Sequence, residues 1–195
     1  MAELILPVDD QAIRELRVGT NLELTGRMIT GRDAAHKWLL EERREEVAPY
    51  LEGTVIYHCG PVVRQHDDGS WEFVAAGPTT SIREEPYQAE VIARYGLRGV
   101  IGKGGMGAQT LAGLKRSGAL YLHAVGGAAQ VLARAVRRVE KVFMLEEFGV
   151  PEAMWVIHVE RFPVMVTMDS HDDSLHADVE HRSRAEFERL LQEAV

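Results

Sequence analysis

Two different patterns of hydrophobic and polar positions divide the chain near its middle. In the segment 21–30, apolar residues occur around Gly26 in a spacing that predicts a strand with a bulge or a turn. The segment 33–47 predicts a helix. Two short apolar segments, 54–57 and 71–76, predict the strands of a hairpin whose turn contains the polar stretch HDDGS. The first half is therefore expected to be rich in β-structure.

The second half alternates helical segments with short apolar runs and glycine turns. Such alternation is typical of βαβ units around a parallel sheet. The predicted helices are 84–95, 105–116 and 128–139, the predicted strands are 97–101, 119–123, 141–145, 154–160 and 163–168, and a charged helix follows at about 183–194. These patterns predict an α/β fold with a mixed sheet, in which parallel βαβ units form the second half.

Length and composition favour one domain over residues 1–195. With 46% hydrophobic and 27% charged residues the chain can build a sizeable core, which excludes a disordered or collagen-like protein. Its net charge of −8 would repel nucleic acid and anionic membranes, so neither is an expected partner. The single cysteine, an acidic N-terminus in place of a signal peptide, and the lack of a bilayer-spanning apolar run predict a soluble, cytoplasmic protein.

A basic region lies inside this acidic chain. Between residues 91 and 139 there is no Asp or Glu, while eight Lys or Arg residues occur. Positive charge threaded through glycine turns suits a small anion better than a polynucleotide, because a polynucleotide would also meet the surrounding negative charge. For five of the eight, a solvated helix face is the simpler interpretation; these are Lys115, Arg116, Arg134, Arg137 and Arg138.

Lys103 differs from these five because of the loop that contains it. The sequence VIGKGGMG, residues 100–107, follows a predicted buried strand and precedes a predicted helix, which is where open α/β sheets bind ligands. Its glycines match the dinucleotide pattern GxGxxG, but no acid for the ribose occurs over residues 108–139. The Walker pattern fails too, because no Ser or Thr follows the lysine. The loop therefore predicts an anion site and disfavours a dinucleotide-binding oxidoreductase.

Other glycine turns also precede predicted helices. The loop GPTTSIR, residues 77–83, offers a proline-fixed turn, three hydroxyls for a helix cap, and Arg83, whose planar guanidinium suits a carboxylate. An ordinary helix cap with a surface arginine is the alternative interpretation of this loop. The loop GRDAAH places Arg32 and Asp33 at a helix start and His36 one turn further on, and HAVGGAAQ contains the last of these turns.

Taken together, these segments resemble one family: the β subunit, or C-terminal half, of the class I, iron–sulfur-dependent fumarate hydratases and L-tartrate dehydratases. The matching pieces, in order, are LTGRMITGRDAAHK (24–37), AAGPTTSIR (75–83), GVIGKGGM (99–106), HAVGGAA (123–129) and VPEAMWVIHVERFPVMVTMD (150–169). The most specific feature is GPTTS combined with Lys103 in its glycine loop. The chain departs from the family pattern at Glu84 and Glu85, where that pattern often has Met and Asp, and in the turn after Asp169.

The resemblance implies a swivelling β/β/α domain and a hydro-lyase that adds water reversibly across the double bond of a small dicarboxylate. It implies a 4Fe–4S cluster as cofactor, held by an α subunit and not by this chain, and an α2β2 assembly with the active site between subunits. Cys59, the single cysteine, agrees independently, because one thiolate cannot hold a cluster or a thiolate zinc site. We therefore expect no metal in this chain. Fumarate to malate is the favoured reaction, and tartrate to oxaloacetate is the other.

The resemblance also implies roles for the loop residues. Arg32, Arg83 and Lys103 would bind the substrate carboxylates, and the last two would also take part in catalysis. Thr79 would contact the substrate and lie closest to the proton transfer, as the base. A threonine hydroxyl is a poor base, so a neighbouring cation or a relay must assist it. We expect these four residues to converge on one edge of the domain as an open half-site without counter-charges.

Three further assignments remain open at this point. Asp33 and His36 form a second acid–base pair that could support the proton transfer. Acids and histidines at 169–176 could bind a metal, but a polar turn is the favoured interpretation, since adjacent turn residues seldom converge on one ion. The functional alternative to a hydro-lyase subunit is a non-catalytic, anion-binding or regulatory α/β domain.

Overall fold

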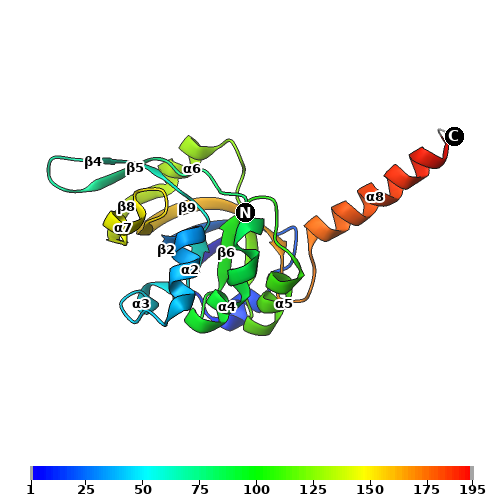
Figure 1. The fold of residues 1–195 in the computed structure, drawn as a ribbon, viewed down its shortest axis with the longest axis horizontal. Coiled ribbons are helices and arrows are strands. Elements are labelled where there is room, and N and C mark those ends of the chain that lie inside the picture. The colour runs from blue at the N-terminus through cyan, green and yellow to red at the C-terminus, as the bar shows by residue number, and fades with distance from the viewer. Residues whose placement is uncertain (1, 194–195) are drawn as a thin grey trace.

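The computed structural model describes residues 2–193, and its main feature is a seven-stranded sheet that curls on itself (Figure 1). The strand order is β1-β2-β3-β6-β7-β9-β8, and β2 also pairs with β9. The strands are β1 (Ala2–Leu6), β2 (Asn21–Thr30), β3 (Val55–Tyr57), β6 (Gly99–Gly102), β7 (Leu120–His123), β8 (Val136–Phe143) and β9 (Met154–Met168). Because β9 pairs with both β7 and β2, the strands β2, β3, β6, β7 and β9 form a closed ring.

The predicted α/β class with a mixed sheet is confirmed. Strands β1, β2, β3, β6 and β7 run parallel to one another. Strand β9 pairs antiparallel with β2, β7 and β8. Side chains of the short parallel strands alternate between two apolar cores: Tyr57 and Ile101 pack in one, and Ile56 and Val100 in the other. Both faces of these strands are therefore buried, as their continuous apolar sequences require.

Helices lie between the strands along the chain, and one more helix follows the last strand. They are α1 (Asp10–Arg14), α2 (Asp33–Glu41), α3 (Ala48–Leu51), α4 (Glu85–Tyr95), α5 (Ala108–Ser117), α6 (Ala129–Ala135), α7 (Leu145–Phe148) and α8 (Leu175–Glu193), with the 3-10 turn η1 (Ser81–Glu84) before α4. Helices α2, α4 and α5 lie side by side over one face of the sheet (Figure 1). Their apolar sides contribute Leu39, Ile92 and Leu114 to the second core.

The strand with an irregularity at Gly26 is confirmed. The pairing of β2 with β9 shifts register between Leu24 and Gly26, and Gly26 has a φ of +127°. A Cβ at this position would overlap the backbone carbonyl oxygen of Leu6 in β1. Glycine is therefore required both by the backbone angle and by the close approach of the neighbouring strand.

The predicted hairpin has a different first strand. The strand β5 (Trp71–Ala75) pairs with β4 (Val62–Gln65), whereas residues 54–57 contain β3, which lies inside the main sheet. The predicted turn is present, with a hydrogen bond from the His66 amide to the Ser70 carbonyl. A three-residue apolar strand buried on both faces has no alternation, so its sequence does not distinguish a parallel partner from a hairpin partner.

Several predicted boundaries are wrong as well. The helix predicted over 128–139 ends at Ala135, because the residues that follow form β8 and pair with β9. The pattern VRRV suits one face of a helix or of a strand, and tertiary pairing decides between them. The two strands predicted over 154–160 and 163–168 are one strand, β9, with a positive φ of 53° at Arg161. The helix predicted over 33–47 ends at Glu41.

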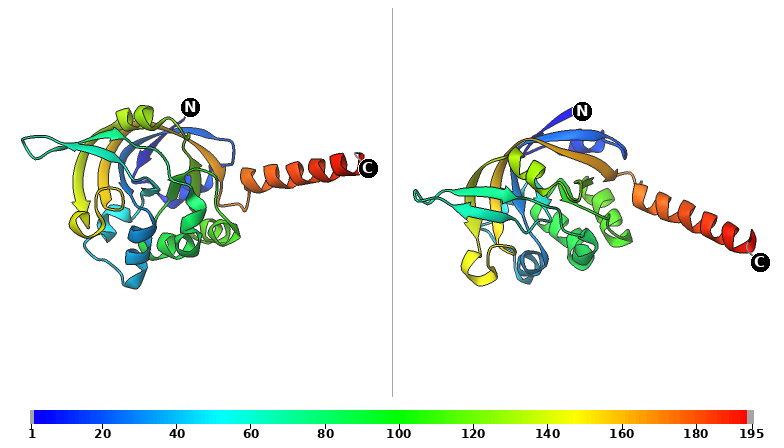
Figure 2. Two further views of the ribbon diagram at one scale, coloured as in Figure 1. Left: turned by 45° about the horizontal axis from the view of Figure 1, so that its top comes forward. Right: turned by 90° about the horizontal axis from the view of Figure 1, so that it is seen from above.

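Helix α8 extends away from the rest of the domain (Figure 2). It begins earlier than predicted, at Leu175, and none of its residues is buried. Within residues 2–193, no helix is both long enough and apolar enough to cross a lipid bilayer.

The close contact at Gly26 predicts the effect of adding a methyl group there. Gly26→Ala should lower the free energy of unfolding by at least about 2 kcal/mol more than Gly69→Ala, because both glycines have positive φ but only Gly26 faces backbone atoms. Urea unfolding followed by circular dichroism measures both variants. Equal losses would contradict the proposed contact between β1 and β2.

Candidate active site

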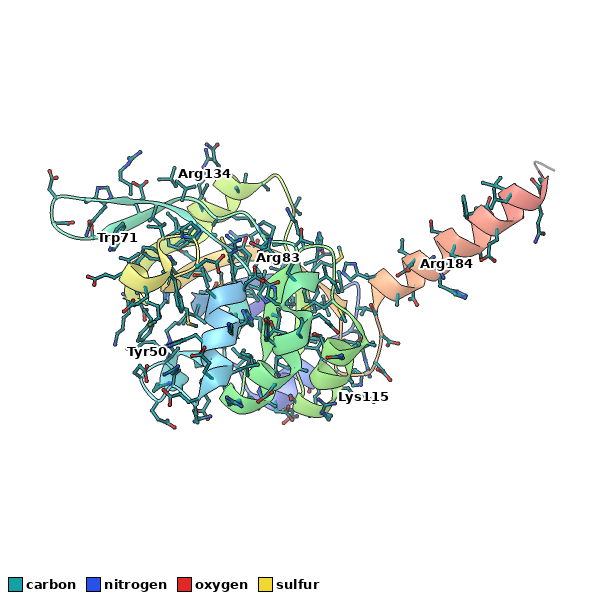
Figure 3. The ribbon with its side chains drawn as sticks, viewed as in Figure 1. Tyr50, Trp71, Arg83, Lys115, Arg134 and Arg184 are labelled. Carbon is teal, nitrogen blue, oxygen red and sulfur yellow. The ribbon has the colours of Figure 1, made fainter. Side chains whose placement is uncertain are left out.

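The candidate site lies at the edge of the sheet where the parallel strands end. The segment after β2 carries Arg32 and Asp33, the segment after β6 carries Lys103, and the loop 77–84 crosses the ends of β3 and β6. Arg83 marks this edge in Figure 3. Carboxyl ends of parallel strands meet at one edge of a sheet, which is the usual ligand position in α/β proteins. The predicted convergence of these segments is therefore present.

Backbone hydrogen bonds tie the loop 77–84 to the ends of β3 and β6. The Thr79 amide donates to the His58 carbonyl at 2.6 Å, and the Lys103 amide donates to the Thr79 carbonyl at 3.3 Å. The Ser81 amide donates in turn to the Lys103 carbonyl at 3.0 Å. We call these three bonds the Thr79–Lys103 clasp. The clasp fixes the backbones of the predicted base and the predicted lysine side by side.

Gly102 allows the loop to come this close to β6. A Cβ at Gly102 would overlap the Ser81 hydroxyl oxygen and would lie 3.1 Å from the Tyr121 hydroxyl. The Ser81 hydroxyl is buried and is hydrogen-bonded to Tyr121 and to His58 Nδ1, each at 2.9 Å. The first glycine of the GxGxxG match therefore serves the packing of the loop 77–84 against the sheet.

The two arginines of the site each have an acidic partner. Arg83 forms an ion pair with Asp33, and both side chains are about half exposed. Arg32 lies 3.2 Å from Glu152, and both of these side chains are more than 70% buried. The expectation that the site cations lack counter-charges is therefore wrong for both arginines. Glu152, in the segment before β9, is a site residue that the sequence analysis missed.

Lys103 is the exception among the cations at this edge. Its side chain is partly buried, and its ammonium forms no ion pair and no hydrogen bond with any residue between 2 and 193. Other basic residues of the same region pair with acids from elsewhere: Arg94 with Glu90, Arg98 with Asp10, Lys115 with Asp172, Arg137 with Glu160 and Arg138 with Glu140. Lys115, Arg116, Arg134, Arg137 and Arg138 are exposed, as the simpler interpretation predicts, but Arg137 and Arg138 lie in the strand β8 and not on a helix.

His36 is not on the surface of this edge. It is fully buried, with Nδ1 2.9 Å from the Arg32 carbonyl and Nε2 2.9 Å from Gln88 Oε1. Burial lowers the pKa of His36. Asp33, in contrast, is partly exposed and holds Arg83. The structure thus separates the two members of the predicted second acid–base pair.

A buried polar cluster under the loop was not predicted from the sequence. It consists of fully buried side chains from five elements and connecting segments: His36, His58, Ser81, Glu84, Gln88 and Tyr121. Burial raises the pKa of the Glu84 carboxyl to about 7, and the charge of Asp33 acts in the same direction. Burial lowers the pKa of His58 well below its usual range. In the sequence only Ser81, within GPTTS, and His36, within GRDAAH, carried a signal of function.

The chain does not offer the ligands that an iron–sulfur cluster needs. Cys59 is fully buried at the end of β3, and burial raises the pKa of its thiol to about 12. A cluster is held by several thiolates, and a single buried, protonated thiol does not fit that requirement. Over residues 2–193, moreover, no three His, Cys, Asp or Glu side chains are grouped so that they could hold a metal ion.

The acidic segment 169–176 forms a turn around Asp169 and then enters the first two residues of α8. The two carboxylate oxygens of Asp169 accept hydrogen bonds from the amides of Val18, His171 and Asp173. The buried carboxylate thus satisfies backbone donors of two segments, which is the usual role of an aspartate in a turn.

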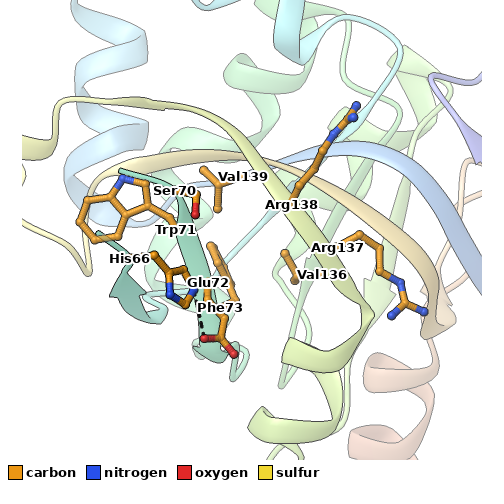
Figure 4. A pocket seen from close by; sticks show the side chains of 9 residues that line it. All are labelled: His66, Ser70, Trp71, Glu72, Phe73, Val136, Arg137, Arg138 and Val139. Carbon is orange, nitrogen blue, oxygen red and sulfur yellow. Dashed lines mark ion pairs between the residues drawn. The ribbon is translucent and has the colours of Figure 1, made fainter. Parts of the chain in front are cut away.

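Two clefts lie near different parts of the sheet. A cleft of about 310 Å³ between the β4–β5 hairpin and β8 is lined by residues such as Trp71, Glu72 and Arg138 (Figure 4), and by none of the predicted site residues. A second cleft, of about 480 Å³, borders the glycine loop at Gly104 and Gly105, beside the exposed Ile82 of η1. Of these two clefts, the second adjoins the candidate site.

The geometry thus defines an α/β domain with an open, cationic edge built from a glycine loop and a hydroxyl-rich loop. Residues 3–179 match the family model described as "Fumarase C-terminus", and the chain belongs to this family. It is 50% identical over 186 residues to a protein named "Putative fumarate hydratase class I" from Geobacillus stearothermophilus. It is 40% identical over 177 residues to the "L(+)-tartrate dehydratase subunit beta" of Escherichia coli K12.

The share of each relative that the chain covers differs. The match covers 95% of this chain but only 35% of the Geobacillus protein. It covers 90% of this chain and 86% of the Escherichia coli protein. A "Putative L(+)-tartrate dehydratase subunit beta" from Methanocaldococcus jannaschii is 37% identical over 182 residues, which are 92% of this chain and 93% of that protein. The chain thus spans about a third of one relative and most of the other two.

The contact between Gly102 and Ser81 predicts a non-additive pair of substitutions. Gly102→Ala should cost about 2–3 kcal/mol of unfolding free energy, because the new Cβ overlaps the Ser81 hydroxyl. Ser81→Ala should cost about 1–3 kcal/mol through lost hydrogen bonds. In the double variant the Ser81 Cβ remains 3.2 Å away, so the combined loss should fall short of the sum by about 1 kcal/mol or more. Additive losses in urea unfolding would show that the loop does not pack against β6.

Proposed function

We propose that this chain is the β subunit of a hydro-lyase that adds water reversibly across the double bond of a small dicarboxylate. The observation that carries the proposal is the Thr79–Lys103 clasp, which places a hydroxyl-rich loop beside a lysine whose ammonium has no partner within residues 2–193. The names of the relatives support the reaction class, since they are a fumarate hydratase and tartrate dehydratase β subunits. Family membership supports it as well.

The proposed roles follow from the charge that develops during the reaction. Removal of a proton from the carbon beside a carboxylate spreads negative charge onto that carboxylate, and fixed cations stabilise the charge. Lys103 is the cation at this edge that has no acidic partner within residues 2–193, so it would bind this carboxylate directly. Arg32 and Arg83 would bind the substrate in competition with, or together with, their present partners Glu152 and Asp33.

Thr79 would act as the base, with Lys103 favouring loss of the hydroxyl proton by its positive charge. Asp33 lies at the same edge and would support the proton transfer. His36 would act from below, through its bond to the Arg32 carbonyl, and not by contact with the substrate. These assignments rest on placement at one edge, together with the resemblance of the loops.

The proposal requires a partner, because one open edge contains no second wall for the substrate. An α subunit would hold the 4Fe–4S cluster, which supplies a Lewis acid for the hydroxyl group, and two copies of each subunit would form the α2β2 enzyme. Residues 1–195 would act as one swivelling domain that closes its edge over the partner, in the cytoplasm. The name "subunit beta" of two relatives supports the existence of a partner subunit.

Fumarate to malate is the favoured reaction, and the 50% identity to a fumarate hydratase supports it. Tartrate to oxaloacetate is the second candidate, supported by the β subunits that the chain matches over most of their length. A non-catalytic anion-binding domain is the alternative of another class. Reconstitution with an α subunit, followed by assays with fumarate, malate and tartrate, separates the three.

The chain alone should contain no iron and show no hydratase activity, because its only cysteine is buried and protonated. Anaerobic addition of the α subunit, iron and sulfide should produce a brown, active enzyme. Iron content and fumarate hydration measured before and after reconstitution test this expectation. Turnover by the chain alone in the presence of a chelator would refute it.

Lys103→Met in the reconstituted enzyme should lower kcat/KM by about 100-fold or more, because the substrate carboxylate loses a cation that has no other partner within residues 2–193. Lys115→Met is the matched control: Lys115 lies at the far end of α5 and pairs with Asp172 (Figure 3). The control should stay within about threefold of the parent. If both substitutions have similarly small effects, Lys103 does not bind the substrate and is an ordinary surface charge.

A further inference from the structure

The buried cluster beneath the Thr79–Lys103 clasp contains a directed chain of hydrogen bonds. The Tyr121 hydroxyl donates to Ser81 Oγ at 2.9 Å. The Ser81 hydroxyl and His58 Nδ1 are 2.9 Å apart, and His58 Nε2 lies 2.8 Å from Gln88 Oε1. A carbonyl oxygen only accepts, so His58 carries its proton on Nε2, and Nδ1 of the neutral ring accepts from Ser81. Each donor in this series of hydrogen bonds thus points toward the next residue of the series, from Tyr121 to Gln88.

This series of hydrogen bonds supports the Thr79–Lys103 clasp at two points. The Ser81 amide donates to the Lys103 carbonyl, and the Ser81 side chain fills the space above Gly102. The His58 carbonyl accepts from the Thr79 amide at 2.6 Å. A shift of Ser81 or His58 would therefore move the backbone of Thr79 or Lys103. The side-chain bond between Ser81 and His58 joins the two supports.

Glu84 is the acid next to this bond. Its side chain is fully buried, and neither carboxyl oxygen has a hydrogen-bond partner within residues 2–193. Oε2 lies 3.9 Å from His58 Nδ1, which is too far for a hydrogen bond. A buried carboxylate without donors is costly, so the neutral form is favoured.

Charged groups around Glu84 come from several elements. Arg83 precedes it in η1, Asp33 and Arg32 lie at the start of α2, and His58 follows β3, with His36 packed edge-on against the His58 ring at 5.0 Å. Burial is the largest influence on the pKa of Glu84, and the charge of Asp33 raises that pKa further. The charges of Arg83 and Arg32 lower it by less.

We propose that Glu84 is a positioning residue for the proposed hydro-lyase reaction: its neutral carboxyl can stay buried beside the bond between Ser81 and His58, and this burial keeps η1 and the Thr79–Lys103 clasp in place. Ionised Glu84, whose proton passes to solvent, would be a buried charge without a donor among residues 2–193, so η1, which carries both Ser81 and Glu84, would shift to let water reach the carboxylate. The clasp would then loosen at Ser81, whose side chain fills the space above Gly102. The expected effect on kcat rests on the proposed function. The protonation of the Glu84 carboxyl rests only on its burial and on its lack of a hydrogen-bond donor within residues 2–193.

Glu84→Gln tests the kinetic consequence, because the amide has the same shape and does not ionise. In the reconstituted enzyme, the ratio of kcat of Glu84→Gln to kcat of the parent should rise at least about threefold between pH 6 and pH 8.5, with KM little changed. Glu90→Gln is the control on the same helix, since Glu90 is exposed and pairs with Arg94. Its ratio to the parent should stay constant with pH.

Whether Glu84 is protonated in the folded state is tested on this chain without the α subunit. The folded chain keeps this proton up to a pH of about 7, whereas the unfolded chain releases it near the ordinary pKa of 4.5. The unfolded state thus binds fewer protons between these values, and the contribution of Glu84 to stability is lost as the pH rises through about 7. The urea midpoint of the parent should therefore fall relative to that of Glu84→Gln between pH 5 and pH 8.5, and the Glu90→Gln control should follow the parent.

The outcomes separate this proposal from the proposed function. A parent enzyme without hydratase activity would refute the function, while the urea midpoints would still show whether Glu84 holds a proton. A constant kcat ratio for Glu84→Gln in an active enzyme would overturn the positioning role, and so would urea midpoints that change with pH as those of the parent do. If Glu84→Gln does not fold, Glu84→Met provides a neutral side chain of similar length for the same measurements.

Discussion

The close approach of the loop 77–84 to β6 is the constraint on which the site depends. It is possible because Gly102 has no Cβ where the Ser81 hydroxyl lies. Three backbone hydrogen bonds then join the loop to the ends of two parallel strands, and these bonds place Thr79 beside Lys103. Packing of apolar strands inside a closed ring supplies the rigid edge that the loop needs.

Charge at this edge is arranged in two layers. In the outer layer, the exposed Arg83 is held by Asp33 and the mostly buried Arg32 by Glu152, and Lys103 has no such partner within residues 2–193. Beneath the surface, a polar cluster is buried with few charges, because burial favours neutral forms of its acid and imidazoles. The first layer suits an anionic ligand, and the second keeps the loop in position.

Much of this arrangement could be predicted from the sequence, and the missing parts have physical reasons. Glycine turns between apolar strands and helices predicted the parallel sheet and the edge with Arg32, Thr79, Arg83 and Lys103. The hairpin partner was wrong because the short strand β3 is buried on both faces and has no alternation. The buried cluster was missed because His58, Glu84 and Gln88 are scattered in sequence and meet only after the helices pack.

The most direct test of the account is the structure of this chain bound to an α subunit and a non-reactive dicarboxylate. The account predicts one carboxylate of the ligand within about 3.5 Å of the Lys103 ammonium, and the Thr79 hydroxyl within about 3.5 Å of the carbon or oxygen atoms that react. Both residues should still be joined by the backbone clasp. A ligand bound entirely by the partner, with Lys103 facing solvent, would contradict the account.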